Sequence, residues 1–313
     1  MEKIRAVLAE PRSDGRLFMG EIERPSPLPS QTLVQVKAVS LNRGEVRRAM
    51  STDSRYVPGW DLAGVVESTA GDGSGPKAGA RVVGLMPVGA WAELVAVPTT
   101  NLAELPDRVS FSQAATLPVA GLTALYLLQR GGNLLGRKVL VTGASGGAGS
   151  FMVQMARLSG ATVIGITHHA GFADSVKDDG AAEVVVGDPA GAGRFGPYHL
   201  IADSVGGSTL AAVFSMLAAG GNCINYGTTA GTEVALNIRV FFGAPRASLS
   251  GFFVFDEIKG EPASQGLERV VALTADGRLR PRIEIEAPWN QVAEIARRLM
   301  DREFSGKAVL LVE

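Results

Sequence analysis

The stretch Lys138-Val-Leu-Val-Thr-Gly-Ala-Ser-Gly-Gly-Ala-Gly149 decides the fold class of this chain. Apolar and β-branched residues run into a glycine-rich turn, and Ser150–Leu158 follows with apolar residues at helical spacing. The segment Gly160–Thr167 then has the composition of a second buried strand. A strand, a glycine turn, a helix and a strand in this order predict one βαβ unit with a phosphate-binding turn at its front.

The glycine turn predicts an anion site made of backbone N–H groups. Unpaired amides at a helix N-terminus carry partial positive charge, which attracts a diphosphate. We expect Gly146 to let the diphosphate approach the main chain, and Gly149 to let the helix pack closely on the strand. Ala144 stands where the first glycine of the G-x-G-x-x-G pattern would be. The residues expected to bind the cofactor here are Ala144, Ser145, Gly146, Gly147, Ala148 and Gly149.

Composition narrows the class of protein. The 313 residues suffice for two domains, and a hydrophobic share of 46% allows a sizeable core. The 30 basic and 31 acidic residues are not segregated into long runs, which argues against nucleic-acid or membrane binding. The N-terminus shows no apolar targeting core, and the single cysteine, Cys223, cannot form an internal disulfide. These features are typical of a cytoplasmic globular protein.

Two textures along the chain predict two domains. Short apolar segments punctuated by Gly and Pro predict an all-β module over residues 1–112. Strands that alternate with helices over 113–255 predict a parallel sheet covered on both faces. Residues 256–313 are too few for a separate domain, so we expect them to complete the first one.

Individual elements follow from the same periodicities. The expected strands of the first module are 32–39, 62–66, 81–85 and 91–97. The expected helices further along are 113–128, 171–179, 208–217 (ended by Ala218-Ala-Gly-Gly221), 264–275 and 290–301. The later strands are expected at 183–188, 198–205, 222–226, 249–255, near Ile283 and at 306–312.

The sequence lacks the residues that several kinds of catalytic or binding site require. Metal sites need Cys, His or carboxylate clusters at ligand spacing, whereas this sequence has one Cys and three His that form no such cluster. The sequence contains neither a G-x-S-x-G elbow nor a Walker A pattern. We therefore expect no metal, and we expect a bound cofactor to supply most of the chemistry.

The chain resembles the medium-chain dehydrogenase/reductase superfamily, in its zinc-free quinone oxidoreductase and enoyl reductase branch. The matching segments occur in the family's order and are 40–45, 58–66, 89–93, 117–124, the glycine turn, 203–207 and 305–309. The resemblance implies a Rossmann domain with a doubly wound parallel sheet, a GroES-like β-barrel catalytic domain and an active site in the cleft between them. It also implies a homodimer that reduces quinones or activated carbon–carbon double bonds with NAD(P)H. Zinc alcohol dehydrogenases have a cysteine where Asn42 falls and a His-Glu pair where Trp60-Asp61 falls.

The end of the second Rossmann strand predicts which coenzyme is used. NAD enzymes place an acid there for the ribose, and that acid repels the 2′-phosphate of NADP. Here the strand ends Thr167-His168-His169 without an acid, which favours NADPH. Relatives often have a lysine where Phe172 stands. Lys177 and Arg157 are alternative contacts for this phosphate. The two histidines could equally be solvated loop residues that contact no ligand.

The remaining site residues are expected partly from the resemblance and partly from their place after the fourth and fifth strands of the sheet, where Ser204, Gly227 and Thr228 stand. Thr123, Ser204, Gly227, Thr228, Phe252, Phe253 and Lys307 are expected at the cofactor, although Thr123 and the two phenylalanines also suit core packing and Lys307 a surface position. Asn42, Arg47 and Tyr56 are the catalytic candidates. Asn42 would donate to a carbonyl or position the nicotinamide. Arg47 or Tyr56 would act on a substrate oxygen, although Arg47 also suits a solvated surface position. Glu45 replaces the family's Asp, and relatives often have a tyrosine where Val46 and Arg47 stand.

The leading hypothesis is a zinc-independent, NADPH-dependent reductase of quinones or α,β-unsaturated carbonyl compounds. Trp60, Phe241, Phe242 and Phe252 hint at a hydrophobic small-molecule acceptor. The alternative is a nucleotide-binding sensor or structural protein with little catalysis. Zinc-dependent alcohol oxidation is disfavoured by the number of available ligands.

Overall fold

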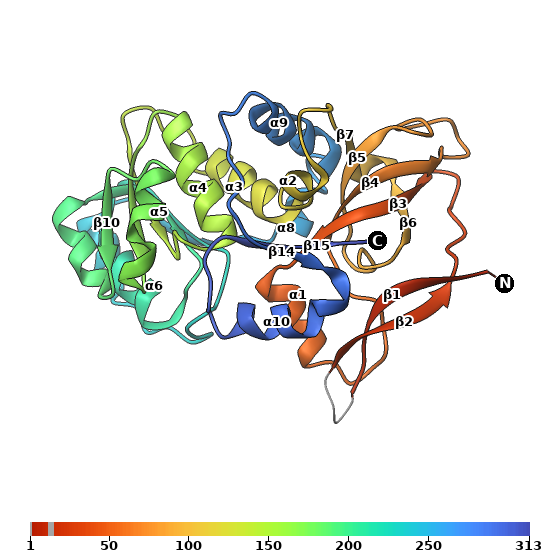
Figure 1. Ribbon diagram of the computed structural model, residues 1–313. Coiled ribbons are helices and arrows are strands. Elements are labelled where there is room, and N and C mark those ends of the chain that lie inside the picture. The colour runs from red at the N-terminus through yellow and green to blue at the C-terminus, as the bar shows by residue number, and fades with distance from the viewer. Residues whose placement is uncertain (1, 12–15) are drawn as a thin grey trace. The chain divides into compact units, whose positions relative to one another are not determined.

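The computed structural model describes residues 2–11 and 16–313. It contains two compact units (Figure 1). Unit 1 comprises Met1–Leu122 and Ile258–Glu313, and unit 2 comprises Thr123–Glu257. The chain passes between the units after Leu122 and after Glu257. The sequence predicted these limits at residues 112 and 255. Helix α3 (Pro118–Arg130) spans the first division.

Unit 1 is built mainly from antiparallel strands. Its seven-stranded sheet has the order β14-β15-β3-β4-β5-β7, and β6 also pairs with β3. The strands are β3 (Gln31–Ser40), β4 (Asp61–Ser68), β5 (Arg81–Leu85), β6 (Leu94–Pro98), β7 (Leu102–Glu104), β14 (Ile283–Pro288) and β15 (Lys307–Leu311). The C-terminal strand β15 lies antiparallel to β3, with Val309 opposite Ser40. Residues far apart in the sequence thus form one sheet.

The remaining elements of unit 1 flank this sheet. A separate hairpin, which was not predicted from the sequence, pairs β1 (Lys3–Ala9) with β2 (Leu17–Glu23). The helices are α1 (Arg43–Met50), α2 (Phe111–Ala115), α9 (Ala263–Ala275) and α10 (Val292–Met300), with short 3₁₀ turns at Thr99–Asn101 and Trp289–Gln291. The core of the unit includes the fully buried Trp91 and apolar residues of β3 and β4.

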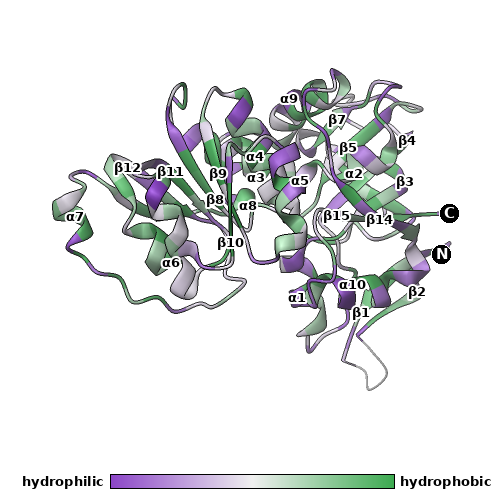
Figure 2. Ribbon diagram, turned by 60° about the vertical axis from the view of Figure 1, so that its left-hand side comes forward, coloured by the Kyte–Doolittle hydropathy of each residue, from purple (hydrophilic) through white to green (hydrophobic). Residues whose placement is uncertain are grey.

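Unit 2 contains the parallel sheet that the sequence predicted. Its strand order is β10-β9-β8-β11-β12-β13, and every neighbouring pair is parallel. The strands are β8 (Lys138–Thr142), β9 (Thr162–Thr167), β10 (Glu183–Val186), β11 (Tyr198–Asp203), β12 (Leu217–Asn225) and β13 (Ser248–Gly251). Figure 2 shows the apolar character of β8 and β9, whose inner residues are buried. This Rossmann-like sheet confirms the predicted α/β fold class.

Helices connect the parallel strands of unit 2. They are α4 (Gly147–Leu158), α5 (Ala173–Asp178), α6 (Gly207–Phe214), α7 (Val240–Gly243) and α8 (Val254–Glu257), with 3₁₀ turns at Ala170–Phe172 and Pro189–Phe195. The order of the strands reverses between β8 and β11, because the chain runs outward from β8 to β10 and then crosses to β11. Ligands of open α/β sheets bind at the carboxyl ends of the strands at such a switch point.

Three predicted elements need correction. The expected helix 113–128 is two helices, because Pro118 lacks the N–H that a helix interior needs and instead begins α3. The residues Ala218–Gly221 are part of β12 rather than a helix end. A Cβ on Gly221 would lie 2.7 Å from the carbonyl oxygen of Tyr198, so the glycine permits this strand to approach β11. The expected strand 249–255 ends at Gly251, and α8 follows it.

Candidate functional site

The glycine turn of unit 2 joins β8 to α4. Helix α4 begins at Gly147, and its N-cap Gly146 provides no side-chain cap. The first amides of an α-helix have no acceptor within the helix, so this N-terminus keeps its donors for a ligand. Gly149 is needed for packing, because a Cβ there would lie 2.2 Å from the carbonyl oxygen of Gly143.

The outward side of the turn leaves room for a ligand. A Cβ on Gly146 would have only the Gly143 oxygen within 4 Å, at 3.3 Å. Ala144 is buried, and its N–H donates to the carbonyl of Ile166 in β9. The hydroxyl oxygens of Ser145 and Thr167 are 3.1 Å apart. The turn is therefore anchored to the neighbouring strand while Gly146 leaves an open approach.

A buried carboxylate organises the switch point. Asp203 ends β11, and its Oδ1 accepts the hydroxyl of Thr142 at 2.6 Å. Its Oδ2 accepts Gly206 N–H at 2.9 Å and the Asn225 amide at 2.7 Å. These bonds tie together the carboxyl ends of β8, β11 and β12. The strand ends beside the glycine turn are thereby held in one arrangement.

Ser204 and Gly227 extend this edge. Ser204 donates its hydroxyl to the Thr142 carbonyl at 3.0 Å. A Cβ on Gly227 would lie 2.6 Å from the Ser204 carbonyl oxygen, which explains a glycine at this position. Both residues thus belong to the same carboxyl edge of the sheet as the glycine turn, as the sequence predicted.

A pocket of about 610 Å³ lies at the carboxyl ends of β12 and β13. Its lining includes four of the predicted cofactor residues, Gly227, Thr228, Phe252 and Phe253, and also Arg130 and Glu257. Arg130 donates to the Gly251 carbonyl at 2.9 Å and pairs with Glu257 at 2.6 Å. Its guanidinium also lies 5.6 Å from the centre of the Phe252 ring. The arginine fixes the main chain at the pocket wall.

The phenylalanines of unit 2 do not all share this pocket. Phe252 is buried, whereas Phe253 is 60% exposed and its ring lies beside that of Phe255. The lining includes neither Phe241 nor Phe242. Phe241 packs on Phe214, and Phe242 is 82% exposed. The sequence-based grouping of these aromatic residues as one apolar cleft is thus not what unit 2 shows.

Strand β9 ends at Thr167, and no acidic residue stands there or at the next two positions. Thr167 is buried, and His168 and His169 are exposed. The two imidazole rings meet edge to face with centroids 4.8 Å apart, and the His169 ring meets Phe172 in the same way. Thr123 is buried in α3.

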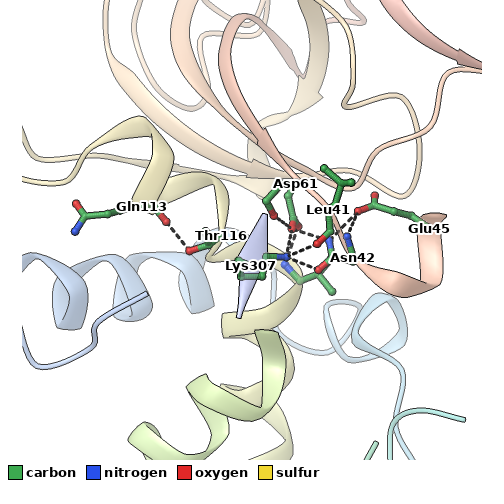
Figure 3. Close-up of polar contacts among 9 residues, drawn as sticks. Leu41, Asn42, Glu45, Asp61, Gln113, Thr116 and Lys307 are labelled. Atoms are coloured by element: carbon green, nitrogen blue, oxygen red, sulfur yellow. Dashed lines mark hydrogen bonds and ion pairs between the residues drawn. The ribbon is translucent and has the colours of Figure 1, made fainter. Parts of the chain in front are cut away.

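Unit 1 contains a second polar cluster, drawn in Figure 3. Asn42, the N-cap of α1, donates its side-chain amide to Glu45 Oε1 at 2.9 Å and to Asp61 Oδ2 at 2.7 Å. Lys307 Nζ lies 2.6 Å from Asn42 Oδ1, 3.0 Å from the Leu41 carbonyl oxygen and 3.4 Å from Asp61 Oδ2. Residues from three distant parts of the sequence therefore form one hydrogen-bonded group.

The cluster holds more acid than base. Burial raises the pKa of Glu45 well above its ordinary value, the neighbouring charge of Asp61 raises it further, and Lys307 and the Asn42 donors oppose these effects. Glu45 Oε2 is buried and has no hydrogen-bond partner within the described chain. A carboxyl in such surroundings favours its neutral form.

The cluster changes the roles expected of two residues. Both N–H groups of the Asn42 amide donate to the side-chain oxygens of Glu45 and Asp61, so this geometry leaves neither for a substrate carbonyl. Lys307 is only 3% exposed, and its three donors have acceptors within unit 1 rather than a free approach to a cofactor phosphate.

Arg47 and Tyr56 keep accessible side chains. Arg47 is exposed on α1, and Tyr56 is half-buried with the Arg48 guanidinium 5.4 Å from the centre of its ring. Burial raises the pKa of the Tyr56 phenol, Arg48 lowers it and Glu45 raises it. The hydroxyl therefore keeps its proton at neutral pH.

The residues at the family's metal position do not fit a zinc ion. Asn42 stands at the position of a cysteine ligand, Trp60 at that of a histidine, and the ammonium of Lys307 already contacts Asp61. Across residues 2–11 and 16–313, no three His, Cys, Asp or Glu side chains form a group that could hold a metal. No helix within the same residues is long and apolar enough to cross a bilayer.

Comparisons with known proteins agree with both units. The alcohol dehydrogenase GroES-like domain family matches residues 28–107, and the zinc-binding dehydrogenase family matches residues 173–310. The quinone oxidoreductase of Pongo abelii is 30% identical over 317 residues, which cover 94% of this chain and 93% of that protein. The synaptic vesicle membrane protein VAT-1 homolog of Homo sapiens is 27% identical over 322 residues, covering 92% and 80% of the two chains.

A solved structure is also similar to this chain over almost its whole length. A mycobacterial protein complexed with NADPH superposes with a TM-score of 0.89 at 25% identity, covering 99% of this chain and 100% of the other. A GroES-like unit and a Rossmann-like unit with a glycine turn define a dinucleotide-dependent dehydrogenase or reductase. The chain belongs to the medium-chain dehydrogenase/reductase superfamily, in its quinone oxidoreductase branch. It is an NAD(P)H-dependent oxidoreductase.

Four residues of these clusters were not among the site residues that the sequence predicted. Asp61 lies among apolar residues at the start of a buried strand, and an acid in that position signals a buried partner. Thr142 directly precedes the turn, and its hydroxyl role was not anticipated. Nothing in the sequence around Arg130 or Asn225 marks either as a site residue, because only the folded sheet brings them to the pocket.

Proposed function

We propose that this protein uses NADPH to reduce quinones or α,β-unsaturated carbonyl compounds by hydride transfer, without zinc. The observation that carries the proposal is the uncapped N-terminus of α4 behind the open face of Gly146. A diphosphate at this place would be held by main-chain amides and by the helix dipole. The similarity to a quinone oxidoreductase supports the acceptor class.

The chain's own residues would bind and orient the reactants. The bound coenzyme supplies the hydride. The pocket at the ends of β12 and β13 suits the nicotinamide half of the coenzyme, with Phe252 on its wall and Arg130 holding the Gly251 peptide. We assign oxyanion stabilisation to Tyr56 or Arg47, since the Tyr56 phenol keeps its proton and Arg47 is exposed. Asn42 then acts by positioning α1 rather than by touching the substrate.

The preference for NADPH is supported by the end of β9. An acid there would repel the 2′-phosphate, and Thr167, His168 and His169 offer none. The exposed imidazoles are free of that repulsion. Zinc independence is supported by the ammonium that occupies the cluster around Asp61.

We further propose a homodimer that works in the cytoplasm on a hydrophobic small molecule. Strand β13 is the edge of its sheet, and all four of its residues are exposed. Phe242 and Ile238 are 82% and 68% exposed in the same unit. An unprotected edge strand and exposed apolar side chains are both suited to association with a second copy. The single buried thiol, Cys223, is compatible with a reducing compartment.

A coenzyme-oxidation assay tests the activity. Purified protein should consume NADPH with members of a panel of quinones and enones, and Tyr56→Phe or Arg47→Met should lower kcat. Tight NADPH binding without turnover on the whole panel would instead favour a nucleotide-binding sensor. Metal analysis of the purified active protein should find substoichiometric zinc, and activity that disappears on chelation would contradict the zinc-free proposal.

A further inference from the structure

Three oxygen atoms in unit 1 surround the side-chain ammonium group of Lys307. They are Asn42 Oδ1, the Leu41 carbonyl oxygen and Asp61 Oδ2, at 2.6, 3.0 and 3.4 Å from Lys307 Nζ. Amide, carbonyl and carboxylate oxygens are the donor set that hard metal ions take in proteins. Here each of the three ammonium N–H groups has one acceptor.

Burial makes this cation necessary. Asp61 is fully buried, and its Oδ2 also accepts the Ser40 hydroxyl at 2.6 Å and the Asn42 amide at 2.7 Å. Its Oδ1 accepts the N–H of Val119 at 2.9 Å. These neutral donors carry no full charge, so the positive charge that offsets the Asp61 carboxylate comes from Lys307. A buried carboxylate without a counter-charge is strongly unfavourable.

The ammonium also decides how Asn42 is oriented. With Oδ1 facing Lys307, the two N–H groups of the amide must face Glu45 and Asp61. Asn42 is the N-cap of α1, and Glu45 Oε1 accepts its main-chain N–H at 2.7 Å. The start of the helix that carries Arg47 is therefore fixed through the lysine.

We propose that Lys307 is the built-in cation of unit 1, a positioning residue whose ammonium takes the place of a bound metal ion and sets the start of α1. The positioning part rests on the proposed function, because it acts through Arg47 and the segment leading to Tyr56. The cation part stands on the geometry of the cluster alone.

Chemical rescue of the full-length Lys307→Ala variant tests both parts. Alanine keeps Cβ, so n-propylammonium matches the atoms removed, and 1-propanol is its neutral counterpart. We expect the variant to lose roughly 5 °C or more in Tm and up to about 100-fold in kcat. Propylammonium should restore both in a saturable manner and propanol should not. The Kd for NADPH should stay unchanged, because the three acceptors of Lys307 all lie in unit 1.

Two further variants control the experiment. Lys307→Met should show the same losses without rescue, because its side chain fills the space that the amine needs. Lys3→Ala removes an exposed lysine and should resemble the parent protein. If Lys307→Ala folds only poorly, the yield of refolding with propylammonium against propanol provides the same comparison.

The proposal would be overturned by wild-type Tm in Lys307→Ala, or by equal rescue with amine and alcohol. A raised Kd for NADPH would also overturn it, because it would assign Lys307 to the coenzyme instead. If wild-type protein binds no dinucleotide, the proposed function fails, whereas the effect of the amine on Tm still decides whether Lys307 is the built-in cation.

Discussion

The hydroxyl of Thr142 donates to the Asp203 carboxylate over 2.6 Å and joins the ends of β8 and β11. These two strands are neighbours in the sheet, although two other strands and two α-helices lie between them in the sequence. Thr142 also accepts the N–H of Ser204 at 3.1 Å. One side chain therefore organises the place where the strand order reverses and the glycine turn begins.

Replacing Thr142 should loosen this edge. Thr142→Val keeps the shape but removes a donor from a buried carboxylate, which should cost about 1.5–3 kcal/mol in the free energy of unfolding. The same change should weaken coenzyme binding, and Thr142→Ser should restore both. Urea unfolding and NADPH titration of the two variants provide the measurement. Equal stability of the valine and serine variants would show that the bond to Asp203 contributes nothing.

The residue after β9 should control the choice of coenzyme. His168→Asp places a negative charge where the 2′-phosphate is expected, so the ratio of kcat/KM for NADPH to that for NADH should fall at least roughly tenfold. His168→Asn, which adds no charge, is the matched control and should retain most of the preference. A wild-type protein with equal kcat/KM for both coenzymes would contradict the assignment.

The buried Glu45 should give the stability of unit 1 a specific pH dependence. Burial and the charge of Asp61 raise its pKa above the ordinary 4.5, so the folded chain holds this proton more tightly than the unfolded chain. Its contribution is therefore greatest at low pH and is lost as pH rises from about 4.5 through the folded-state pKa, with a limiting slope of about 1.4 kcal/mol per pH unit.

Glu45→Gln isolates this contribution, because glutamine cannot ionise and its carbonyl can still accept from Asn42. The stability of the variant relative to wild type should increase with pH above 4.5 and then level off. Urea unfolding at a series of pH values measures the difference. Parallel curves for the two proteins would show that folding does not change the pKa of this carboxyl.

The edge strand β13 predicts the state of association. Wild-type protein should have twice the chain mass of 32.6 kDa in light scattering. The double variant Phe242→Asp and Leu249→Asp adds charge to β13 and to the exposed helix α7 that precedes it in the chain, and it should be monomeric. Leu28→Asp changes an exposed leucine of unit 1 and should leave the mass unchanged. A monomeric wild-type protein would contradict the proposal of a homodimer.

Local patterns explain why the parallel sheet was predictable. The apolar run of β8, the glycines after it and the spacing of α4 are adjacent in the sequence, so periodicity alone reveals the βαβ unit. The hairpin of β1 and β2 was missed because Leu17–Glu23 mixes glycine and acids with its apolar residues. Ala218–Gly221 resembles a helix end, and only the pairing of β12 with β11 makes it a strand.

The polar clusters were less predictable because their bonds are long-range. Lys307 and Asp61 are 246 positions apart, and nothing near either residue identifies the other as its partner. The sequence therefore identified Asn42 and Lys307 as site residues but not the contacts that they make. In contrast, the residues of the glycine turn lie together in the chain, and their backbone geometry follows from the glycines themselves.

The central claim is that main-chain amides at Gly146–Gly149 hold the diphosphate of the coenzyme. Calorimetric titration of wild-type protein and Gly146→Ala with NADPH tests it most directly. The backbone angle at Gly146 (φ −75°) is one that alanine adopts, and its Cβ would meet only the Gly143 oxygen, at 3.3 Å, so the variant should fold and yet bind NADPH at least roughly tenfold more weakly. Gly193→Ala, where a Cβ meets only Met216 at 3.8 Å, should bind like wild type. Undiminished affinity in Gly146→Ala, or no binding by wild-type protein, would contradict the claim.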